Sequence, residues 1–473
     1  MKLLYIDLFC GAGGTSTGIE NARYEGRQCA KVIGCVNHDA NAIASHAANH
    51  PDALHFTEDI RTLELSPLTA HIAEMRRQYP DAFVVLWASL ECTNFSKAKG
   101  GQPRDADSRT LAEHLFRYIE AIEPDYIQIE NVEEFMSWGD LDENGKPISK
   151  DAGRLYQQWV SNVRGYGYRF AHRILNSADF GAYTSRRRFF GIFAKGSLPI
   201  VFPDPTHCKE GTTGLFGQMK RWKPVREVLD FTDEGESIFG RKKPLVDATL
   251  ERIYAGLIKF VAGGKEAFLV KWNSMSQTGK YHAPSIDEPC PTVATQNRLG
   301  IAQVNFLSKH YGGNPAGKCV SVEEPAGTIT TWDHHSFITA YYGNGHNHSI
   351  DAPAPTLTTR DRLAFVDMQY GNGTPCGIET PAPTVTTNPK HQLVTCRMKQ
   401  QGATIAVTTD DSPAMAKIKR FMALYGIIDI KMRMLRIPEL KRIMGFPSDY
   451  VLVGTQADQK KFIGNAVEVN MAR

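Results

Sequence analysis

Strand and helix patterns alternate along the first 195 residues of this 473-residue chain. Apolar runs of strand length predict strands at Leu3–Ile6, Lys31–Val36, Phe83–Trp87, Tyr126–Ile129 and Phe189–Phe193. A helical pattern runs from Leu111 to Ile122 and is ended by Pro124. This alternation is typical of an α/β fold with a doubly wound, Rossmann-like sheet.

A change in composition near Pro199 predicts a second region. From there to about residue 430, the chain is rich in Gly, Pro, Thr, His and Asn. A Pro-Thr motif occurs in this region at residues 288–295, 324–331, 352–359 and 380–387. Thr-rich segments that begin with proline suit short β-elements, so we expect a region built mostly of β-strands and loops.

Composition and charge limit the class of protein only weakly. The mean hydropathy of −0.32 and the lack of a long apolar run exclude a membrane-spanning segment. A net charge of +3 neither supports nor excludes nucleic-acid binding, because a near-neutral protein can have a basic cleft. Nine cysteines without a Cys-x-x-Cys pair predict free thiols, a reducing cytoplasmic location and no metal site.

Cys92 is the first candidate for chemistry. It lies in the run from Ala88 to Ser96, directly after the predicted strand Phe83–Trp87. The carboxyl end of such a strand opens onto the crevice where α/β sheets bind ligands. A thiol there suits a nucleophile, although a buried and inert cysteine is the common alternative.

A glycine-rich turn follows the first predicted strand. The run Asp7-Leu8-Phe9-Cys10-Gly11-Ala12-Gly13-Gly14 leads from this strand into a helical pattern. Strand, glycine turn and helix together predict a nucleotide-type cofactor site, where glycines let the backbone approach the ligand. A plain tight turn is the alternative. A phosphate-binding P-loop fits poorly, because no Lys-Ser or Lys-Thr pair follows.

Two other predicted strands have charged residues at their ends. The strand Tyr126–Ile129 leads into Glu130 and Asn131, and a carboxyl group near a thiol is a candidate acid. Arg186 and Arg188 alternate, so on a strand they would point to one face and could grip a phosphate or a base. The alternatives are a glutamate at a helix N-terminus and a solvated basic edge strand.

Short motifs follow one another in a fixed order along the chain. They are Asp7 to Gly14, Asp59-Ile60-Arg61-x-Leu63, Cys92-x-x-Phe95-Ser96, Glu130-Asn131-Val132, Arg186-x-Arg188, Arg433-x-Leu435 with Glu439, Gly445-Phe446-Pro447-x-Asp449-Tyr450 and Ile463-Gly464-Asn465-Ala466-Val467. In order and spacing they resemble the cytosine-5 DNA methyltransferase family, over about residues 1–195 and 430–473. So many matches in the right order exclude chance.

The sequence departs from the family pattern at several positions. The family usually has Pro before the nucleophile and Gln after it, where this chain has Glu91 and Thr93. Thr184 stands where the arginine motif usually begins with Gln. The usual ribose-binding acidic residue falls near Asn37, with Asp39 two residues on. A carboxylate beside a thiolate raises the thiol pKa, so Glu91 would slow attack unless a cation compensates or its side chain points away.

The resemblance implies covalent catalysis on a flipped-out base. A Cys92 thiolate would attack carbon-6 of cytosine while Glu130 gives a proton or hydrogen bond at N3. Carbon-5 would then take the methyl group of S-adenosylmethionine, and loss of the carbon-5 proton would expel Cys92. We expect Arg188 at the cytosine O2, Arg186 at the backbone near the loop, and Asn131 in support of the Glu130 loop.

The resemblance also implies S-adenosylmethionine as the cofactor. Phe9 would stack on its adenine, Gly11 and Gly13 would admit its methionine end, and Asp59 would read the adenine amino group. The other residues expected to bind the cofactor are Asp7, Gly14, Asp39, Ile60 and Asn465, the last of which would close the pocket.

Family architecture predicts three segments. Residues 1–198 would form the cofactor-binding and catalytic domain, residues 199–429 a target-recognition domain, and residues 430–473 a return to the catalytic domain. Polar runs after the Pro-Thr motifs are Gln296-Asn297-Arg298, Trp332-Asp333-His334-His335, Arg360-Asp361-Arg362 and Asn388-Pro389-Lys390-His391. Asn, Gln and Arg read base edges in the major groove, so some of these should contact DNA; ordinary polar turns are the alternative.

The expected activity is methyl transfer to carbon-5 of cytosine in a specific double-stranded DNA sequence, by a monomer that binds no membrane. The recognised sequence and the existence of a cognate restriction endonuclease stay open. Two other interpretations also stay open. One is the same fold acting on RNA or with an altered cofactor or product, and the other is a catalytically inactive DNA-binding homologue.

Overall fold

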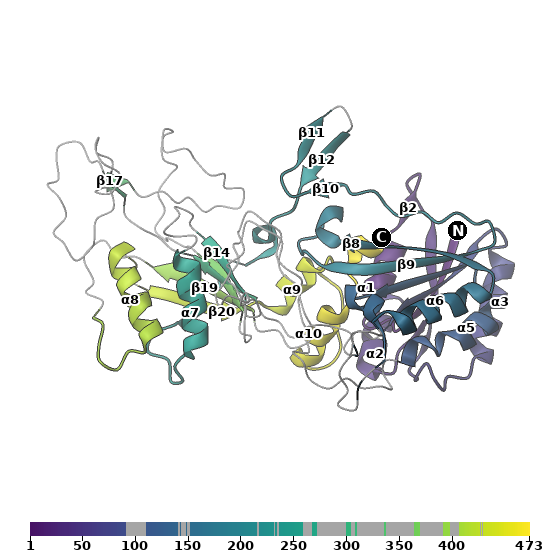
Figure 1. Cartoon of the computed structure of the whole chain (residues 1–473), viewed down its shortest axis with the longest axis horizontal. Coiled ribbons are helices and arrows are strands. Elements are labelled where there is room, and N and C mark those ends of the chain that lie inside the picture. Colours follow the sequence, from purple (N-terminus) through teal and green to yellow (C-terminus); the bar gives the residue numbers. More distant parts are fainter. Residues whose placement is uncertain are drawn as a thin grey trace. The chain divides into compact units, whose positions relative to one another are not determined.

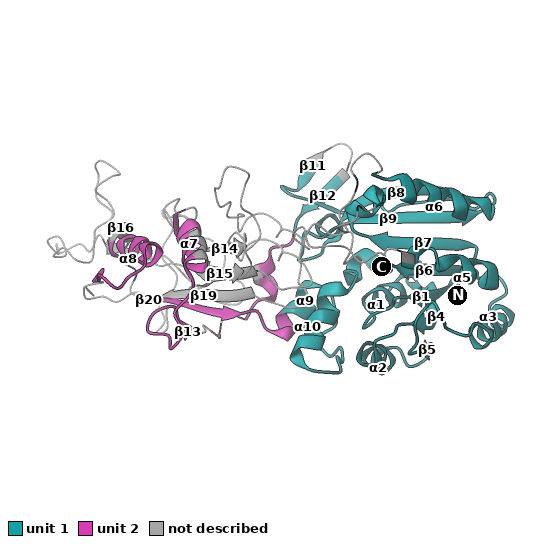
Figure 2. Cartoon of the chain, turned by 60° about the horizontal axis from the view of Figure 1, so that its bottom comes forward, with its two compact units in different colours: residues 1–222, 440–473 teal, residues 223–439 magenta. Residues whose placement is uncertain are grey.

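A computed structural model shows two compact units, residues 1–222 with 440–473 (unit 1) and residues 223–439 (unit 2), coloured separately in Figure 2. The loop of Cys92 and the four Pro-Thr motifs lie outside the described residues. The structure describes residues 1–90, 110–140, 142, 148, 152–214, 217–230, 232–233, 236–258, 267–271, 299–303, 308–309, 335–336, 364–368, 391–397, 406–425, 427 and 429–473.

Unit 1 is built around a seven-stranded sheet (Figure 1). Its strands are β1 (Leu3–Leu8), β4 (Ala30–Val36), β5 (Leu54–Phe56), β6 (Phe83–Ser89), β7 (Tyr126–Asn131), β8 (Tyr168–Asn176) and β9 (Arg187–Lys195). They lie in the order β5-β4-β1-β6-β7-β9-β8. The first five are parallel, whereas β9 is antiparallel to both neighbours. All five strands predicted from the sequence are present, and the α/β fold with a doubly wound sheet is confirmed.

Helices cover both faces of this sheet. On one face, α3 (Ser66–Gln78), α5 (Leu115–Ile122) and α6 (Arg154–Gly165) share a core with Leu4, Ile6 and Leu8 of β1. On the other face, α1 (Gly14–Glu20) and α2 (Ala40–Asn49) share a core with Tyr5 of β1. Successive side chains of β1 therefore point to opposite faces, as expected for a strand buried on both sides.

The helix expected from Leu111 begins later. A 3-10 turn, Thr110–Ala112, precedes α5, which starts only at Leu115. The carbonyl of Ala112 accepts a hydrogen bond from Trp159 Nε1 at 2.8 Å, so a tertiary contact occupies this carbonyl. Among the described residues, no helix is long and apolar enough to cross a membrane.

The C-terminal segment returns to unit 1. It contains α10 (Gln456–Asn465) and α11 (Val469–Ala472), and α9 (Ile437–Ile443) precedes them at the junction of the two units. α11 packs against α1, where Gly18 leaves room for it. The smaller elements of unit 1 are β2 (Arg23–Tyr24), β3 (Arg27–Gln28), β10 (His207–Cys208), β11 (Thr212–Gly214) and β12 (Gly217–Arg221), with 3-10 turns Glu133–Ser137 and Ser177–Phe180.

Unit 2 combines a six-stranded sheet with two helices. Its strands are β13 (Glu236–Ser237), β14 (Ala267–Lys271), β15 (Leu299–Gln303), β18 (Ala364–Met368), β19 (His391–Arg397) and β20 (Asp429–Met434). The helices are α7 (Asp247–Gly256) and α8 (Pro413–Tyr425), and β16 (Ser308–Lys309) pairs with β17 (His335–Ser336). The boundaries between the units lie after residues 222 and 439. Both are later along the chain than the boundaries expected from the family pattern, after residues 198 and 429.

A buried ion pair joins two residues of unit 2 that belong to the C-terminal motifs. Both terminal nitrogens of Arg433 donate to the carboxylate of Glu439 at 2.9 Å. The backbone amides of Asp230 and Arg436 also donate to this carboxylate, at 2.8 and 2.7 Å. The motif Arg433-x-Leu435 with Glu439 thus fixes the turn between β20 and α9.

Candidate active site

The candidate site lies where the parallel strands of unit 1 end. β1 is paired with β4 on one side and with β6 on the other, so the direction of the strand order reverses at β1. Doubly wound sheets bind their ligands at such a reversal. The glycine turn leaves β1 and the Cys92 loop leaves β6 at this point, because Leu8 is paired with Ala88.

The glycine turn has backbone conformations that favour glycine. Gly11 and Gly13 have φ values of 53° and 98°, and Phe9, which is half-buried, has a φ of 61°. Among the described residues, a Cβ atom at Gly11 would meet no atom within 4 Å, whereas one at Gly13 would lie close to the Tyr450 hydroxyl, 2.3 Å away. The turn is therefore tightly packed beneath Gly13 and open at Gly11.

Residues from the far end of the chain support this turn. The Tyr450 hydroxyl donates a hydrogen bond to the carbonyl of Ala12. A Cβ atom at Gly14 would lie 2.6 Å from the carbonyl oxygen of Val467, so the backbones approach closely. Asn465, the residue expected to close the pocket, is exposed at the end of α10, two residues before Val467. The glycine turn, which is the first motif of the chain, is thus packed directly against residues of the last two motifs.

Asp7 lies fully buried in β1, below the glycine turn. Its Oδ2 accepts a hydrogen bond from Ser16 Oγ of α1 at 2.8 Å. Burial raises the pKa of Asp7 to about 7, although the Ser16 hydrogen bond opposes the shift. The carboxyl group therefore links β1 to α1 from inside the fold.

Asp39 serves as the N-cap of α2. Its Oδ1 accepts hydrogen bonds from the amides of Asn41 and Ala42, at 3.0 and 3.2 Å. Its Oδ2 pairs with Lys461 of α10 at 3.1 Å. Asn37, which follows β4, accepts a hydrogen bond from the Asp39 amide at 2.9 Å. The carboxylate of Asp39 is thus already shared between a helix cap and an ion pair.

Asp59 and Ile60 lie on a loop that follows β5. Asp59 accepts hydrogen bonds from Arg61, which lower the pKa of the carboxyl to about 2. The carbonyl of buried Ile60 accepts hydrogen bonds from Arg117 Nη1 at 2.9 Å and from Tyr118 OH at 3.0 Å. Two side chains of α5 therefore hold this loop in place.

Glu130 and Arg188 form a buried ion pair at the end of β7. Arg188 Nε lies 3.3 Å from Glu130 Oε1, and these residues are 9% and 6% exposed. Glu130 is paired in the sheet with Ser89, three residues before Cys92. Burial raises the pKa of Glu130, whereas Arg188 and then Arg186 oppose the shift. A buried carboxyl group with a raised pKa can hold a proton and donate it.

Asn131 connects β7 to the start of the nucleophile loop. Its Nδ2 donates a hydrogen bond to the carbonyl of Leu90 at 3.4 Å, and its Oδ1 accepts one from the amide of Val132 at 2.8 Å. Leu90 is the last described residue before Cys92. Glu91, Cys92 and Thr93 lie outside the described residues, so the structure places only the anchor of their loop.

The arginine motif alternates in burial. Arg186 and Arg188 are buried, whereas Arg187 between them is exposed and pairs with Glu133 at 2.6 Å. Arg186 Nη1 donates a hydrogen bond to the carbonyl of Gly464 at 3.2 Å, which connects this motif to the last one. Thr184, at the position of the family's Gln, is fully buried, and its hydroxyl has no hydrogen-bond partner among the described residues.

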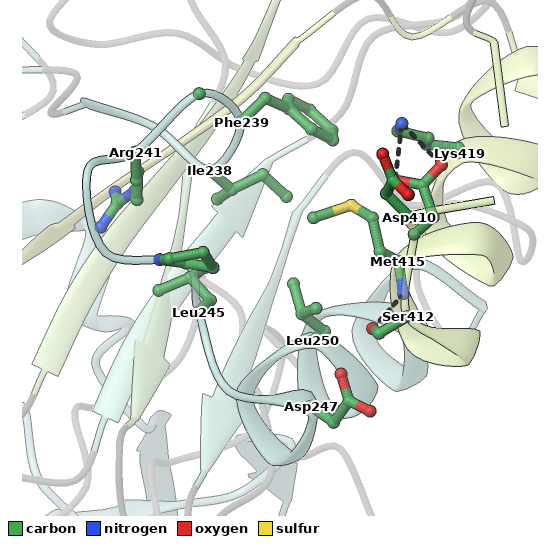
Figure 3. Close-up of a pocket in the computed structure, with 13 residues that line it drawn as sticks. Ile238, Phe239, Arg241, Leu245, Asp247, Leu250, Asp410, Ser412, Met415 and Lys419 are labelled. Carbon is green, nitrogen blue, oxygen red and sulfur yellow. Dashed lines mark hydrogen bonds and ion pairs between the residues drawn. The ribbon is translucent and has the colours of Figure 1, made fainter. Parts of the chain in front are cut away.

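A cavity of about 320 Å³ lies elsewhere, within unit 2 (Figure 3). Apolar side chains from β13 to α7 and from α8 line it, among them Ile238, Leu250 and Met415. Lys419 at its edge pairs with Asp411 at 2.7 Å. None of the residues predicted for catalysis or cofactor binding lines this cavity.

Sequence reasoning missed several residues that position the site. Ser16, Arg117, Tyr118 and Lys461 each hold a predicted site residue or its loop through a contact described above. Each contact joins different elements, and Lys461 lies 422 residues from its partner. A polar residue on a helix gives no local signal of such a partner.

Comparison with known proteins adds a family match. The model of the family described as "C-5 cytosine-specific DNA methylase" matches residues 3–234 and 324–473 of the chain. The chain is 27% identical over 216 residues to type II methyltransferase M1.HphI of Haemophilus parahaemolyticus, covering 45% of this chain and 52% of that protein. It is 28% identical over 211 residues to type II methyltransferase M.AgeI of Thalassovita gelatinovora, covering 44% of each. The chain thus spans about half the length of these two relatives.

Proposed function

The chain belongs to the C-5 cytosine-specific DNA methylase family, and on this premise we propose that it methylates carbon-5 of cytosine in a specific double-stranded DNA sequence. The observation that best supports this activity is the buried Glu130–Arg188 pair. It offers a proton-holding carboxyl group and a guanidinium group at the sheet edge where the glycine turn and the Cys92 loop begin. These two groups suit N3 and O2 of a cytosine that has been flipped out of the duplex.

Cys92 is the nucleophile in this proposal. Its thiolate forms a bond to carbon-6 while Glu130 gives a proton to N3, so that carbon-5 becomes nucleophilic. After carbon-5 has been methylated, water takes its remaining proton, the bond between carbon-6 and Cys92 breaks to release the thiolate, and N3 returns its proton to Glu130. Arg188 holds O2, Arg186 supports the backbone, and Asn131 positions the loop through Leu90.

We assign S-adenosylmethionine to the open side of the glycine turn. The space at Gly11 fits a ligand there, because a Cβ atom at this residue would meet none of the described residues within 4 Å. When bound, the cofactor supplies the electrophilic methyl group. The residues we assign to it are Asp7, Phe9, Gly11, Gly13, Gly14, Asp39, Asp59, Ile60 and Asn465. Among these residues, Asp7 is buried below the turn, so we assign it an indirect part in cofactor binding, through the turn that it supports.

Unit 2 is the proposed target-recognition domain. It occupies the position of the insert between the catalytic motifs, and it includes the four Pro-Thr motifs. The polar runs after these motifs are the proposed base-reading residues; they lie outside the described residues except for His335 and His391, which begin short strands. The matched relatives are named as type II methyltransferases, which supports a restriction-modification context with a cognate restriction endonuclease. A cytoplasmic, monomeric enzyme is part of the same proposal.

The first experiment is transfer of a tritiated methyl group from S-adenosylmethionine into mixed-sequence duplex DNA, followed by nucleoside analysis. We expect 5-methylcytosine from the wild type, none from Cys92→Ser, and wild-type levels from Cys29→Ser, which alters a thiol away from the site. Cys92→Ser should still bind DNA. No incorporation by a folded protein that binds the cofactor would contradict the proposal.

Two further substrates separate the alternatives. Duplex DNA that contains 5-fluorocytosine should trap a covalent adduct at Cys92, because a fluorine atom at carbon-5 cannot leave as a proton does. A catalytically inactive homologue would bind this DNA without an adduct. Incorporation into RNA but not into DNA would instead assign the same site to a different nucleic acid.

A further inference from the structure

Two cysteines and a histidine from three elements converge beneath the glycine turn. Cys10 follows β1, Cys35 lies in β4, and His46 lies in α2. The two Sγ atoms and a ring nitrogen of His46 lie within 4.8 Å of one another. All three residues are buried, and none of them belongs to the catalytic or cofactor-binding residues assigned above.

The distance between Cys35 and His46 matches that of a tetrahedral zinc site, and Cys10 Sγ lies within 4.8 Å of both. With metal–sulfur and metal–nitrogen distances of about 2.3 and 2.0 Å, sulfur and nitrogen ligands lie about 3.6 Å apart. Cys35 Sγ already lies 3.4 Å from His46 Nε2. An ion between these atoms would therefore need only small side-chain movements. Two thiolates and an imidazole are ligands that favour thiophilic cations over Mg²⁺ or Ca²⁺.

The second ring nitrogen of His46 has a suitable partner. His46 Nδ1 lies 2.9 Å from His55 Nε2. If Nε2 of His46 binds a cation, its Nδ1–H can donate to His55, which fixes the tautomer as in most metal-binding histidines. His46 is fully buried, so both of its ring nitrogens are held by neighbouring side chains rather than by solvent.

One hydroxyl oxygen lies beside the proposed His46 ligand. Ser16 Oγ is 2.9 Å from His46 Nε2 and donates to Asp7 Oδ2. The other oxygen of Asp7, Oδ1, is buried and has no hydrogen-bond partner among the described residues. Asp7 is not among the residues whose ligand atoms all lie within 4.8 Å of one another, so its carboxyl group acts on the proposed site only through Ser16.

Charge also favours a divalent ion here. Cys10 and Cys35 are buried, and an isolated thiolate is poorly stabilised inside a fold. A divalent cation with two thiolates has no net charge, so the complete site avoids the cost of a buried charge. Binding therefore releases the two thiol protons, as metal sites formed by cysteines do.

We propose that Cys10, Cys35 and His46 bind one thiophilic divalent cation of the zinc class. Cys10 lies between Phe9 and Gly11, so the ion would tie the glycine turn to β4 and α2. The absence of a Cys-x-x-Cys pair does not conflict with this site. The ligands come from separate elements, and the parallel pairing of β1 with β4 brings them together, Asp7 being opposite Cys35.

The test uses the full chain, reduced and stripped with a chelator, and then titrated with Co²⁺. We expect one equivalent to give the visible and near-ultraviolet absorption of tetrahedral cobalt–thiolate coordination, which Zn²⁺ then displaces. Cys10→Ala and Cys35→Ala should each weaken binding by at least about 100-fold, whereas Cys29→Ala should leave it unchanged. Circular dichroism of each variant reports whether it has folded.

A second measurement needs no variant. X-ray absorption at the zinc edge of the zinc-loaded wild type should show two sulfur ligands at about 2.3 Å, with nitrogen or oxygen for the rest. Absence of cobalt–thiolate absorption in the reduced wild type would overturn the proposal. So would a sulfur count other than two, or unchanged binding by the Cys10→Ala/Cys35→Ala double variant.

Discussion

Glu130 and Glu133 lie three residues apart and each pairs with an arginine, but their surroundings differ. The Glu130–Arg188 pair is buried, with both side chains at most 11% exposed. The Glu133–Arg187 pair is open to solvent, with side chains that are 38% and 61% exposed. A proton can be held and donated only where burial raises the carboxyl pKa, which singles out Glu130.

We expect Glu130→Gln to slow methyl transfer by roughly 100-fold or more, because the variant cannot donate a proton at N3. Single-turnover transfer from labelled S-adenosylmethionine measures this rate, and cofactor affinity should not change. Glu133→Gln is the matched control and should keep the wild-type rate. Equal rates for the two variants would contradict the role given to Glu130.

The raised pKa of Asp7 predicts that the free energy of unfolding depends on pH. Its folded-state pKa of about 7 is higher than the ordinary value of 3.8, so the folded protein holds a proton that the unfolded chain releases between these values. This group therefore stabilises the fold most at low pH, and its contribution falls by about 1.4 kcal/mol per pH unit from about pH 4 to about 7. Asp7→Asn should remove this slope from the unfolding free energy, measured by denaturant titration with a chelator present.

Asp59 provides the control for this slope. Its pKa of about 2 is lower than its ordinary value, so it is ionised in both states between pH 4 and 7. The stability that ionised Asp59 contributes is therefore complete above about pH 4 and is lost as the pH falls from there through about 2. Asp59→Asn should thus leave the slope between pH 4 and 7 unchanged, and a slope that persists in Asp7→Asn would refute the assignment to Asp7.

The sequence predicts residues at strand ends well and their supporting partners poorly. Glu130 and Arg188 could be predicted because each adjoins an apolar run, and strand ends in an α/β sheet meet at one edge. Tyr450 and Lys461 contact the glycine turn and Asp39 across more than 400 residues of chain. Such contacts depend on how the whole chain returns, and no local pattern encodes them.

At the scale of elements, the central strands were predictable and the edge strands were not. β1, β4, β6 and β7 are buried on both faces and appear as apolar runs. At the edges, β5 has only three residues, and β8 exposes Arg169, His172 and Arg173. An edge strand with polar residues has no continuous apolar run, so it resembles a loop in the sequence.

The glycine turn gives a prediction at this scale. Gly13→Ala places a methyl group 2.3 Å from the Tyr450 hydroxyl at a φ of 98°. We expect a loss of stability on the order of 2–4 kcal/mol from the strained backbone and the overpacking. Cofactor affinity should fall as well, since the turn must shift. Denaturant unfolding and calorimetric titration with S-adenosylmethionine measure the two effects.

Two further variants identify the cause of that loss. Gly26 has a φ of 75°, and a Cβ atom there would meet no described residue within 4 Å, so Gly26→Ala has only the backbone strain and should cost about 1 kcal/mol. Tyr450→Phe removes the clashing oxygen, so the double variant with Gly13→Ala should recover part of the stability. If the free-energy changes of Gly13→Ala and Tyr450→Phe simply add in the double variant, contact with Tyr450 is not the cause of the lost stability.

At the scale of the whole molecule, unit 1 is completed only when residues 440–473 return to residues 1–222. Gly14 meets the backbone of Val467, and Gly18 meets α11, so two glycines of α1 provide the docking surface. The catalytic motifs are therefore divided between two segments, with unit 2 inserted between them. This arrangement lets a large insert vary without interrupting the sheet.

Gly18 tests whether this return determines the stability of unit 1. A Cβ atom there would lie 2.5 Å from both the Ala472 Cβ and the Val469 carbonyl oxygen, so Gly18→Ala should displace α11 and cost roughly 1–3 kcal/mol. Gly165→Ala makes the same change in α6, where a Cβ atom would meet nothing within 4 Å in the part of the chain that the structure describes, and it should be neutral or stabilising by up to about 1 kcal/mol. When residues 469–473 are deleted, the truncated protein with Gly18→Ala and the truncated protein without it should have the same free energy of unfolding. If Gly18→Ala still lowers the free energy of unfolding after this deletion, the cause lies inside α1. Gly18 would then not be the residue that allows α11 to dock.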